Sequence, residues 1–207
     1  MAKLKGEKDP QAFAARVSGK LAGHYRAVGL DLGSNCGVAW ADFKPNQNIE
    51  TIKMFAGQWI LKLLGDYDTG PLRMVRLKQF LSILQPDLIG FEDVKFTPDS
   101  QALAGAPVGV IVARVSKPAE LLGGFKVILT TWAEERGVPA HGYGIGAIKK
   151  HATGKGVANK AQMILAANER FGVNLNPEDY QSTGADNIAD AMHICEMVIE
   201  QYSGGLA

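Results

Sequence analysis

The sequence predicts an α/β fold with a mixed five-stranded sheet flanked by helices. Three short apolar runs separated by turn residues come first, over residues 27–32, 37–43 and 50–55, and they predict an antiparallel meander. Segments of helical periodicity then alternate with apolar runs, which is the pattern of an α/β sheet. The 207 residues suit one domain, and 46% hydrophobic with 21% charged residues is ordinary globular composition.

The second part of the chain supplies the helices and the remaining strands. A helix is expected to begin near Pro71 and to end before Pro86, and residues 88–91 are expected to form a central strand. Residues 101–116 have the composition of a long Ala-rich helix, which Pro118 breaks or kinks. The other predicted elements are strands over 125–129 and 140–143 and helices over 131–136, 145–151, 159–171 and 186–201. A meander followed by this alternation is the order of an RNase H-like fold.

The N-terminal segment and the lack of a long apolar run limit the expected location. Residues 1–25 carry more Lys and Arg than Asp and Glu. We expect a basic arm there, either disordered or folded as a short helix, before a domain over residues 26–207. A transit peptide is a weaker interpretation because the segment contains Glu7 and Asp9. No apolar run reaches the roughly 18 residues of a membrane span, so no membrane partner is expected.

Net charge and cysteine usage add two further limits. The net charge of +1 gives no overall bias toward nucleic acid, so any such bias must be local. Cys36 and Cys195 are far apart and match no metal-ligand spacing, which favours a reducing compartment. We therefore expect a cytoplasmic protein, with an organelle as the alternative.

Two carboxylates interrupt apolar strands, and both are candidates for chemistry. Asp31 lies within the first predicted strand, and Glu92 directly follows the apolar run 88–91. A charged carboxylate in such surroundings is costly unless it is paired or binds a metal ion. The structural alternatives are an Asp31 that caps the following turn and a Glu92 that pairs with a surface lysine.

Two further carboxylates lie on the last predicted helix. Asp186 and Asp190 are four residues apart, which places both on one helix face, about 6 Å apart along the axis. The small residues Ala185, Ala189 and Ala191 beside them would let this face approach another element closely. Asp186 could instead be only an N-cap, and Asp190 could be an ordinary surface residue.

Together Asp31, Glu92, Asp186 and Asp190 predict a metal-dependent catalytic site. An RNase H-like fold brings these places to one end of the sheet, and clustered carboxylates raise each other's pKa unless a cation neutralises them. Oxygen ligands favour Mg²⁺, for which Mn²⁺ can substitute. Two such ions about 3.5–4 Å apart can activate water and stabilise the leaving oxygen in phosphodiester hydrolysis.

A basic segment without acidic residues lies between Glu135 and Glu169. Its glycines let backbone N–H groups approach a phosphate, and the helix that follows favours an anion at its N-terminus. Its lysines supply sequence-independent attraction to a phosphate backbone. The candidate DNA-binding residues are Lys149, Lys150, Lys155 and Lys160. A flexible, solvated loop with ordinary lysines is the alternative.

Three blocks of the sequence resemble the RuvC-type Holliday junction resolvases. They are GLDLGS at residues 29–34, GFEDV at 90–94, and GKGVANKAQ at 154–162 leading to the acidic helix at 186–192. Their order and spacing cover roughly residues 27–200. The third block is the most specific, because sugar kinases and actin-like ATPases share the first.

The resemblance implies a homodimer that binds a four-way DNA junction and resolves it by paired, symmetric nicks. It implies metal ligation by Asp31, Glu92 and Asp190, with Asp186 as a fourth member. It also implies that Lys149 and Lys160 face the DNA backbone near the cut, where either can offset charge in the transition state. The products would carry 5′-phosphate ends, and the Ala-rich segment 101–116 is either the dimer element or a core helix.

Two departures from the family pattern leave alternatives open. The family commonly spaces its last two metal-site residues three apart, which selects Asn187 rather than Asp186. The family often has an aromatic residue three positions after its Glu. Here that position is Lys95, so the next residue, Phe96, is the candidate that contacts DNA.

Other functions remain as competing hypotheses. A broader RNase H-like nuclease would act on flaps, branched DNA or RNA–DNA hybrids, and a phage member of such a family fits this breadth. A non-catalytic junction-binding protein would keep the basic segment but would tolerate loss of the acids. An actin-like or sugar-kinase ATPase would need a second lobe and a second Gly-rich motif, which the sequence lacks.

Overall fold

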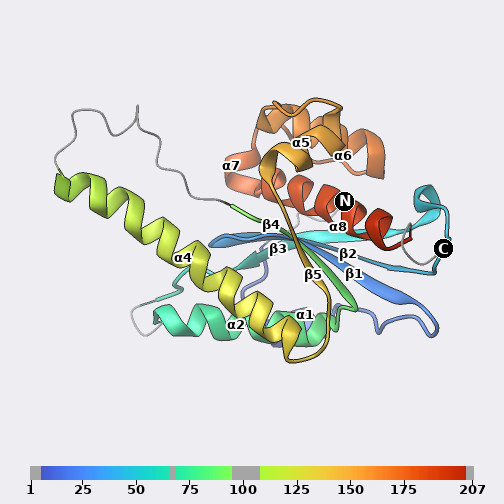
Figure 1. Cartoon of the computed structure of the whole chain (residues 1–207), viewed down its shortest axis with the longest axis horizontal. Helices are drawn as coiled ribbons and strands as arrows, with labels where there is room; N and C mark the ends of the chain where they lie inside the picture. The colour runs from blue at the N-terminus through green and yellow to red at the C-terminus, as the bar shows by residue number, and fades with distance from the viewer. Residues whose placement is uncertain (1–5, 66–68, 95–107, 204–207) are drawn as a thin grey trace.

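A mixed five-stranded sheet forms the centre of the protein, in the order β3-β2-β1-β4-β5. The computed structural model describes residues 6–65, 69–94 and 108–203 (Figure 1). β1 pairs antiparallel with β2 and parallel with β4; β2 pairs antiparallel with β3, and β4 pairs parallel with β5. The strands are β1 (Tyr25–Asp31), β2 (Asn35–Phe43), β3 (Met54–Ile60), β4 (Leu88–Glu92) and β5 (Ala140–Tyr143). The predicted fold class is confirmed.

Helices cover both faces of this sheet, in two layers (Figure 1). One layer holds α5 (Ile145–Thr153), α6 (Lys160–Phe171), α7 (Tyr180–Thr183) and α8 (Ala185–Ser203). The other holds α1 (Pro10–Ala14), α2 (Gly70–Leu84) and α4 (Val108–Glu134). Alternate residues of β1 serve the two cores, because Ala27 packs with α8 whereas Val28 and Leu30 pack with α2. No helix in the described part of the chain is long and apolar enough to cross a membrane.

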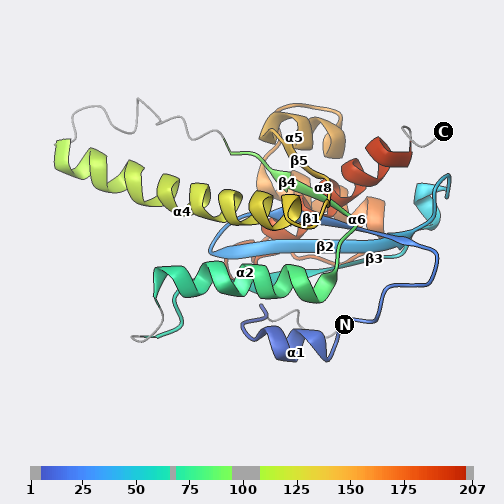
Figure 2. The same cartoon turned by 60° about the horizontal axis from the view of Figure 1, so that its bottom comes forward.

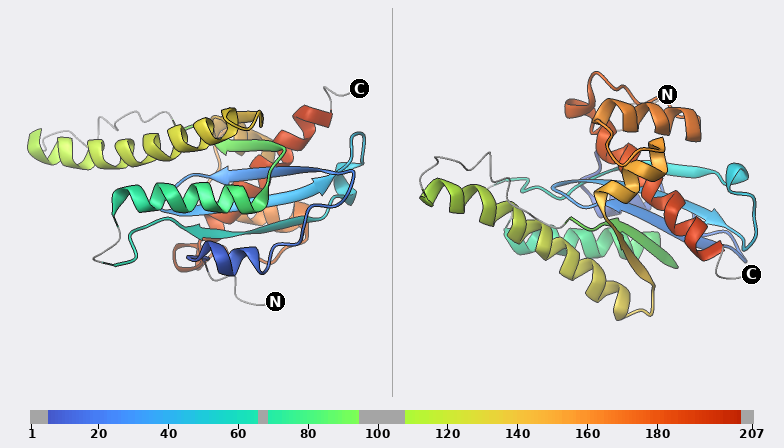
Figure 3. Two further views of the ribbon diagram at one scale, coloured as in Figure 1. Left: turned by 90° about the horizontal axis from the view of Figure 1, so that it is seen from below. Right: turned by 45° about the horizontal axis from the view of Figure 1, so that its top comes forward.

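The helix α4 corrects two of the predictions. The strand expected over 125–129 is wrong, because these residues belong to one helix that continues through Pro118 to Glu134. The predicted break at Pro118 is therefore also wrong. Phe125, Leu129 and Trp132 are buried at helical spacing, so their apolar run is one face of a helix. Residues 131–136 are the end of this helix and the turn after it, and α4 extends well beyond the sheet (Figures 2 and 3).

The third strand begins later than predicted. Residues 50–55 were expected to be extended, but Ile49–Thr51 forms a 3-10 turn and β3 runs from Met54 to Ile60. The side chain of Asn48 caps this turn by accepting a hydrogen bond from the Glu50 N–H. A local side-chain cap thus overrides the strand preference of the apolar residues beside it.

The N-terminal segment packs against the α2 side of the sheet over the part that the structure describes, from Gly6 onward. It contains α1, the short helix that was one of the two expected forms, with Asp9 as its N-cap. Phe13 is buried, and its ring packs edge-on against two other rings. The distance between ring centres is 5.6 Å to Trp59 and 5.4 Å to Phe80. The rings of Trp59 and Phe80 are stacked, with their centres 4.8 Å apart. This segment therefore completes one of the two cores.

Glycines in the sheet allow α8 to lie directly on β1 and β2. A Cβ atom on Gly29 would lie 2.2 Å from the Ala191 carbonyl oxygen, and one on Gly37 would lie 1.9 Å from the Asn187 carbonyl oxygen. Backbone thus contacts backbone at both positions, which only glycine permits. This contact fixes the first half of α8 over the end of β1.

The substitution Gly37→Ala tests this close contact. We expect the free energy of unfolding to fall by about 2–3 kcal/mol, because the added methyl group overpacks the interface. Denaturant unfolding followed by circular dichroism measures the change. The matched control is Gly57→Ala on β3, where a Cβ would meet no atom within 4 Å. Equal stability of the two variants would contradict the packing described here.

Candidate active site

Asp31 and Glu92 lie side by side at one end of the sheet. Asp31 is the last residue of β1 and Glu92 is the last residue of β4, and these strands are parallel neighbours in which Leu30 faces Phe91. Because side chains alternate along a strand, Asp31 follows Gly29 and Glu92 follows Gly90 onto the α8 face. The sheet therefore directs both carboxylates toward the same helix.

Asp186 and Asp190 come from the first turns of that helix. Asp186 is buried, with 7% of its surface exposed, and Asp190 is partly buried. The left-handed conformation of Gly184, with φ 68°, ends α7 and precedes α8. The contact of α8 with Gly29 and Gly37 then places both aspartates over the ends of β1 and β4. The structure brings all four predicted carboxylates into one cluster.

The electrostatics of Asp31 show how strongly these acids act on one another. Burial raises the pKa of Asp31 well above its ordinary value, and the negative charges of Glu92, Asp190 and Asp186 raise it further. A hydrogen bond between the Asp31 and Glu92 carboxyl groups acts in the same direction. The cluster is therefore stabilised by added positive charge, supplied either by protons or by cations.

Burial and the neighbouring carboxylates also affect Asp190. Burial, with the charges of Glu92 and Asp186, raises the pKa of Asp190 from 3.8 to about 7. Lys149 and Lys160 oppose this rise, which shows that both lysines act on the cluster. Two of the four candidate DNA-binding lysines thus belong electrostatically to the acidic site.

Lys160 is the basic residue most closely tied to the acids. It is the first residue of α6, and its ammonium group forms an ion pair with Asp186. This hydrogen bond raises the pKa of Lys160. The Lys160 ammonium also lies 5.0 Å from the ring centre of Tyr180, and 60% of the side chain remains exposed. Lys160 therefore combines contact with the acids and access to solvent.

Where the structure describes them, the other residues that were predicted to bind DNA make no contact with the carboxylates. Lys150 is exposed on α5, and Lys155 is exposed in the loop that follows it. This loop begins at Gly154, which adopts φ 73° and caps α5. Phe96 lies outside the described residues, as does the first part of the segment 101–116.

The structure also locates the two candidates for the fourth metal-site position. Asp186 directs its charge onto Asp31 and Asp190. The Asn187 side chain instead donates a hydrogen bond to the Asn35 carbonyl at 2.8 Å. This geometry favours Asp186 as the fourth member, which stays a prediction.

A second group of possible metal ligands was not found from the sequence. Among the residues that the structure describes, one set of three has ligand atoms within 4.8 Å of one another: His151, His193 and Glu196. No three of the four clustered carboxylates form such a set. The available signal was the i, i+3 spacing of His193 and Glu196 on one helix face, but His151 comes from another helix.

Comparison with known proteins identifies the fold. No protein-family model and no curated protein matches the chain. Two solved structures of RuvC from Thermus thermophilus do match, each at 18% sequence identity. The first, with a TM-score of 0.59, covers 87% of this chain and 96% of that one. The second is a complex with a Holliday junction substrate. It has a TM-score of 0.61, and the match covers 88% of this chain and 97% of the RuvC chain. The chain therefore has the RNase H-like fold of RuvC.

Proposed function

We propose that this protein is a metal-dependent endonuclease that resolves four-way DNA junctions by paired nicks. The observation that carries the proposal is the convergence of four carboxylates, two at the ends of β1 and β4 and two on the first turns of α8. Burial and the charges of the other three acids raise the pKa of Asp31. Such a group favours a cation, and the sequence resemblance to resolvases implies that the same residues bind metal. The fold of RuvC is consistent with this activity, but fold alone does not assign it.

The chemistry of the donors fits Mg²⁺, with Mn²⁺ as a substitute. All four candidate ligands, Asp31, Glu92, Asp186 and Asp190, offer carboxylate oxygens, which hard divalent cations prefer. Phosphodiester hydrolysis of this kind uses two ions about 3.5–4 Å apart, and four carboxylates offer enough oxygen atoms to bind both. Divalent cations bound there would supply a Lewis acid and a water molecule of lowered pKa.

The protein contributes rigid placement and positive charge. Asp31 and Glu92 are held by hydrogen-bonded strands, and Asp186 and Asp190 by a helix in backbone contact with the sheet. Rigid placement of ligands lowers the cost of reaching the reactive geometry. Lys160, with its exposed side chain, can contact a DNA phosphate while remaining beside Asp186.

Two identical sites are needed for paired nicks, so we propose a homodimer. A two-fold dimer presents one site to each of two symmetry-related strands of a junction. The projecting part of α4 is our candidate for the dimer contact, since it extends away from the sheet (Figure 3). Sedimentation of the purified protein would show a monomer if this is wrong.

The range of substrates is tested by a panel of labelled DNAs. We expect Mg²⁺-dependent nicks in a four-way junction, with 5′-phosphate ends, and no cleavage in the presence of a chelator. Equal cleavage of flaps or RNA–DNA hybrids would favour the broader nuclease. Junction binding without any cleavage would favour the non-catalytic alternative.

The substitution Asp31→Asn tests the metal site directly. It keeps the shape of the side chain but removes its charge, so nicking of a synthetic junction should be lost. Junction binding, measured by gel shift, should remain detectable because the lysines are intact. Cleavage near the wild-type rate would show that the metal assignment is wrong.

The pH dependence of stability tests the repulsion among the acids. Because the pKa of Asp190 is raised in the folded protein, its contribution to stability is present below pH 4 and is lost as pH rises through about 7. The Tm of the protein in chelator should therefore fall between about pH 4 and pH 7 and level off above that, and Mg²⁺ should offset the fall.

Asp190→Asn should make this dependence shallower and should raise the Tm at pH 8 in chelator. The matched control is Glu178→Gln, which changes an exposed carboxylate outside the cluster. If Asp190→Asn and Glu178→Gln give the same pH profile as the parent protein, the four carboxylates do not repel one another as described.

Lys160→Ala tests the role of the exposed lysine. We expect the single-turnover cleavage rate to fall by about 100-fold, since a charge that stabilises the transition state is lost. Junction affinity should change much less. The comparison is Lys155→Ala, which should weaken binding and reduce its salt dependence without a specific loss of rate. A larger loss of rate in Lys155→Ala than in Lys160→Ala would reverse the assignment.

A further inference from the structure

Three side chains outside the acidic cluster converge between α5 and α8. They are His151 on α5 and His193 and Glu196 on α8, and one ligand atom from each lies within 4.8 Å of the other two. Because His193 and Glu196 are three residues apart, they lie on one face of α8. The chain thus gathers two imidazoles and a carboxylate at one point.

His193 has an unusual environment for a polar side chain. Only 1% of its surface is exposed, and neither ring nitrogen has a hydrogen-bond partner among the described residues. Burial lowers the pKa of His193 to about 4. Burying a polar group without a hydrogen-bond partner destabilises the folded protein, and a bound ligand would remove this cost.

His151 and Glu196 already face each other. His151 Nε2 lies 3.9 Å from a Glu196 carboxylate oxygen and 3.0 Å from a Glu200 carboxylate oxygen. The hydrogen bond to Glu200 raises the pKa of His151. A proton at this nitrogen and a metal ion are alternatives, because both occupy the same lone pair.

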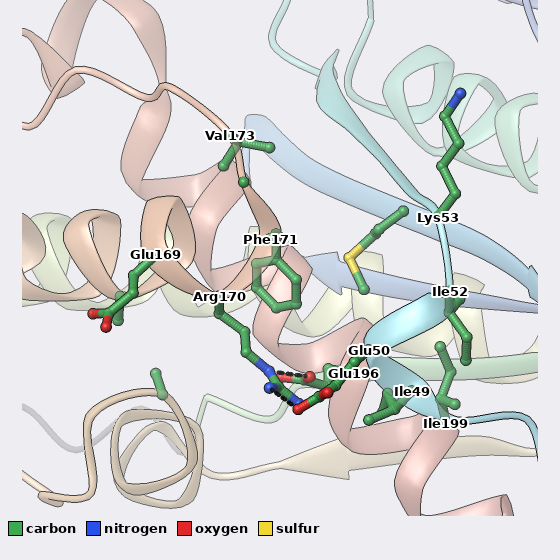
Figure 4. Close-up of a pocket in the computed structure, with 14 residues that line it drawn as sticks. Ile49, Glu50, Ile52, Lys53, Glu169, Arg170, Phe171, Val173, Glu196 and Ile199 are labelled. Carbon is green, nitrogen blue, oxygen red and sulfur yellow. Dashed lines mark hydrogen bonds and ion pairs between the residues drawn. The ribbon is translucent and has the colours of Figure 1, made fainter.

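Glu196 is oriented by an arginine. Arg170 Nε donates a hydrogen bond of 2.8 Å to Oε1 of Glu196, and the other carboxylate oxygen faces His151. Figure 4 shows Arg170, Glu50 and Glu196 pointing toward one another at the wall of a cavity. Carboxylates that bind metals are usually held by a hydrogen bond of this kind.

A cavity lies beside Glu196. It has a volume of about 850 Å³ and is lined by Glu196, Arg170 and Phe171 among others. The Phe171 ring lies 5.2 Å from the His193 ring, so His193 lies directly behind this wall. Of the three proposed ligands, Glu196 alone lines this cavity.

We propose that His151, His193 and Glu196 form a zinc-binding site distinct from the acidic cluster. Two imidazoles with one carboxylate suit Zn²⁺, whereas Mg²⁺ prefers oxygen ligands alone. Glu200 or a water molecule completes the fourth position. The ion joins α5, which carries Lys149, to α8, which carries Asp190, and so stabilises the packing of the helix layer.

The test is a zinc titration of the full chain after treatment with a chelator, in competition with a chromophoric chelator. We expect one tight equivalent of Zn²⁺, retained in Asp190→Asn. Replacement by Co²⁺ should give the visible absorption of a four-coordinate site. His151→Gln should weaken binding by more than roughly 100-fold, since loss of even an outer hydrogen-bond partner of a ligand costs about 10- to 100-fold.

Matched controls separate this site from general metal affinity. The chain has four histidines, and His24→Gln and His141→Gln change the two outside the cluster, so both should retain zinc. Glu196→Gln is a second ligand variant should His151→Gln prove unfolded by circular dichroism. Zinc binding that survives both ligand variants, or that is lost in Asp190→Asn, would overturn the proposal. Absence of a tight equivalent would overturn it as well.

Discussion

The backbone contact between α8 and the sheet is the constraint on which the site depends. Gly29 and Gly37 leave no room for a side chain, so the helix backbone rests directly on β1 and β2. This contact sets the height of Asp186 and Asp190 above Asp31 and Glu92. The carboxylates would otherwise separate, because their charges repel one another. Packing energy in the core beneath α8 therefore holds together groups that electrostatics drives apart.

The same helix serves two regions of different chemistry. Its first turns carry oxygen donors that face the sheet, and its middle carries His193 and Glu196, which face α5 and α6. Positive charge reaches both regions from the same short segment of chain, since Lys160 begins α6 and Arg170 lies near its end. The capping box of Asn159 and Gln162 fixes the start of α6 and with it the position of Lys160.

Much of this arrangement follows from local sequence, but some depends on packing. Asp31 and Glu92 could be identified because each is a charge in an apolar strand. The helices α5, α6 and α8 were predicted close to their observed bounds, whereas the short helix α7 was not predicted. The strand prediction for residues 125–129 was wrong because a short apolar run fits a strand as well as a helix. The helical spacing becomes clear only when the burial of Trp132 is known as well. His151 and His193 could not be paired from sequence, since only the packing of α5 on α8 brings them together.

The buried ring of Phe13 links the start of the chain to the core of the protein. It closes an aromatic group whose other members, Trp59 and Phe80, belong to β3 and α2. A shortened chain that began at β1 would leave these two stacked rings facing water. Exposed aromatic surface of this kind promotes association between copies. Cleavage of the backbone after Phe13 would detach this ring and expose the Trp59 and Phe80 rings, which favours aggregation.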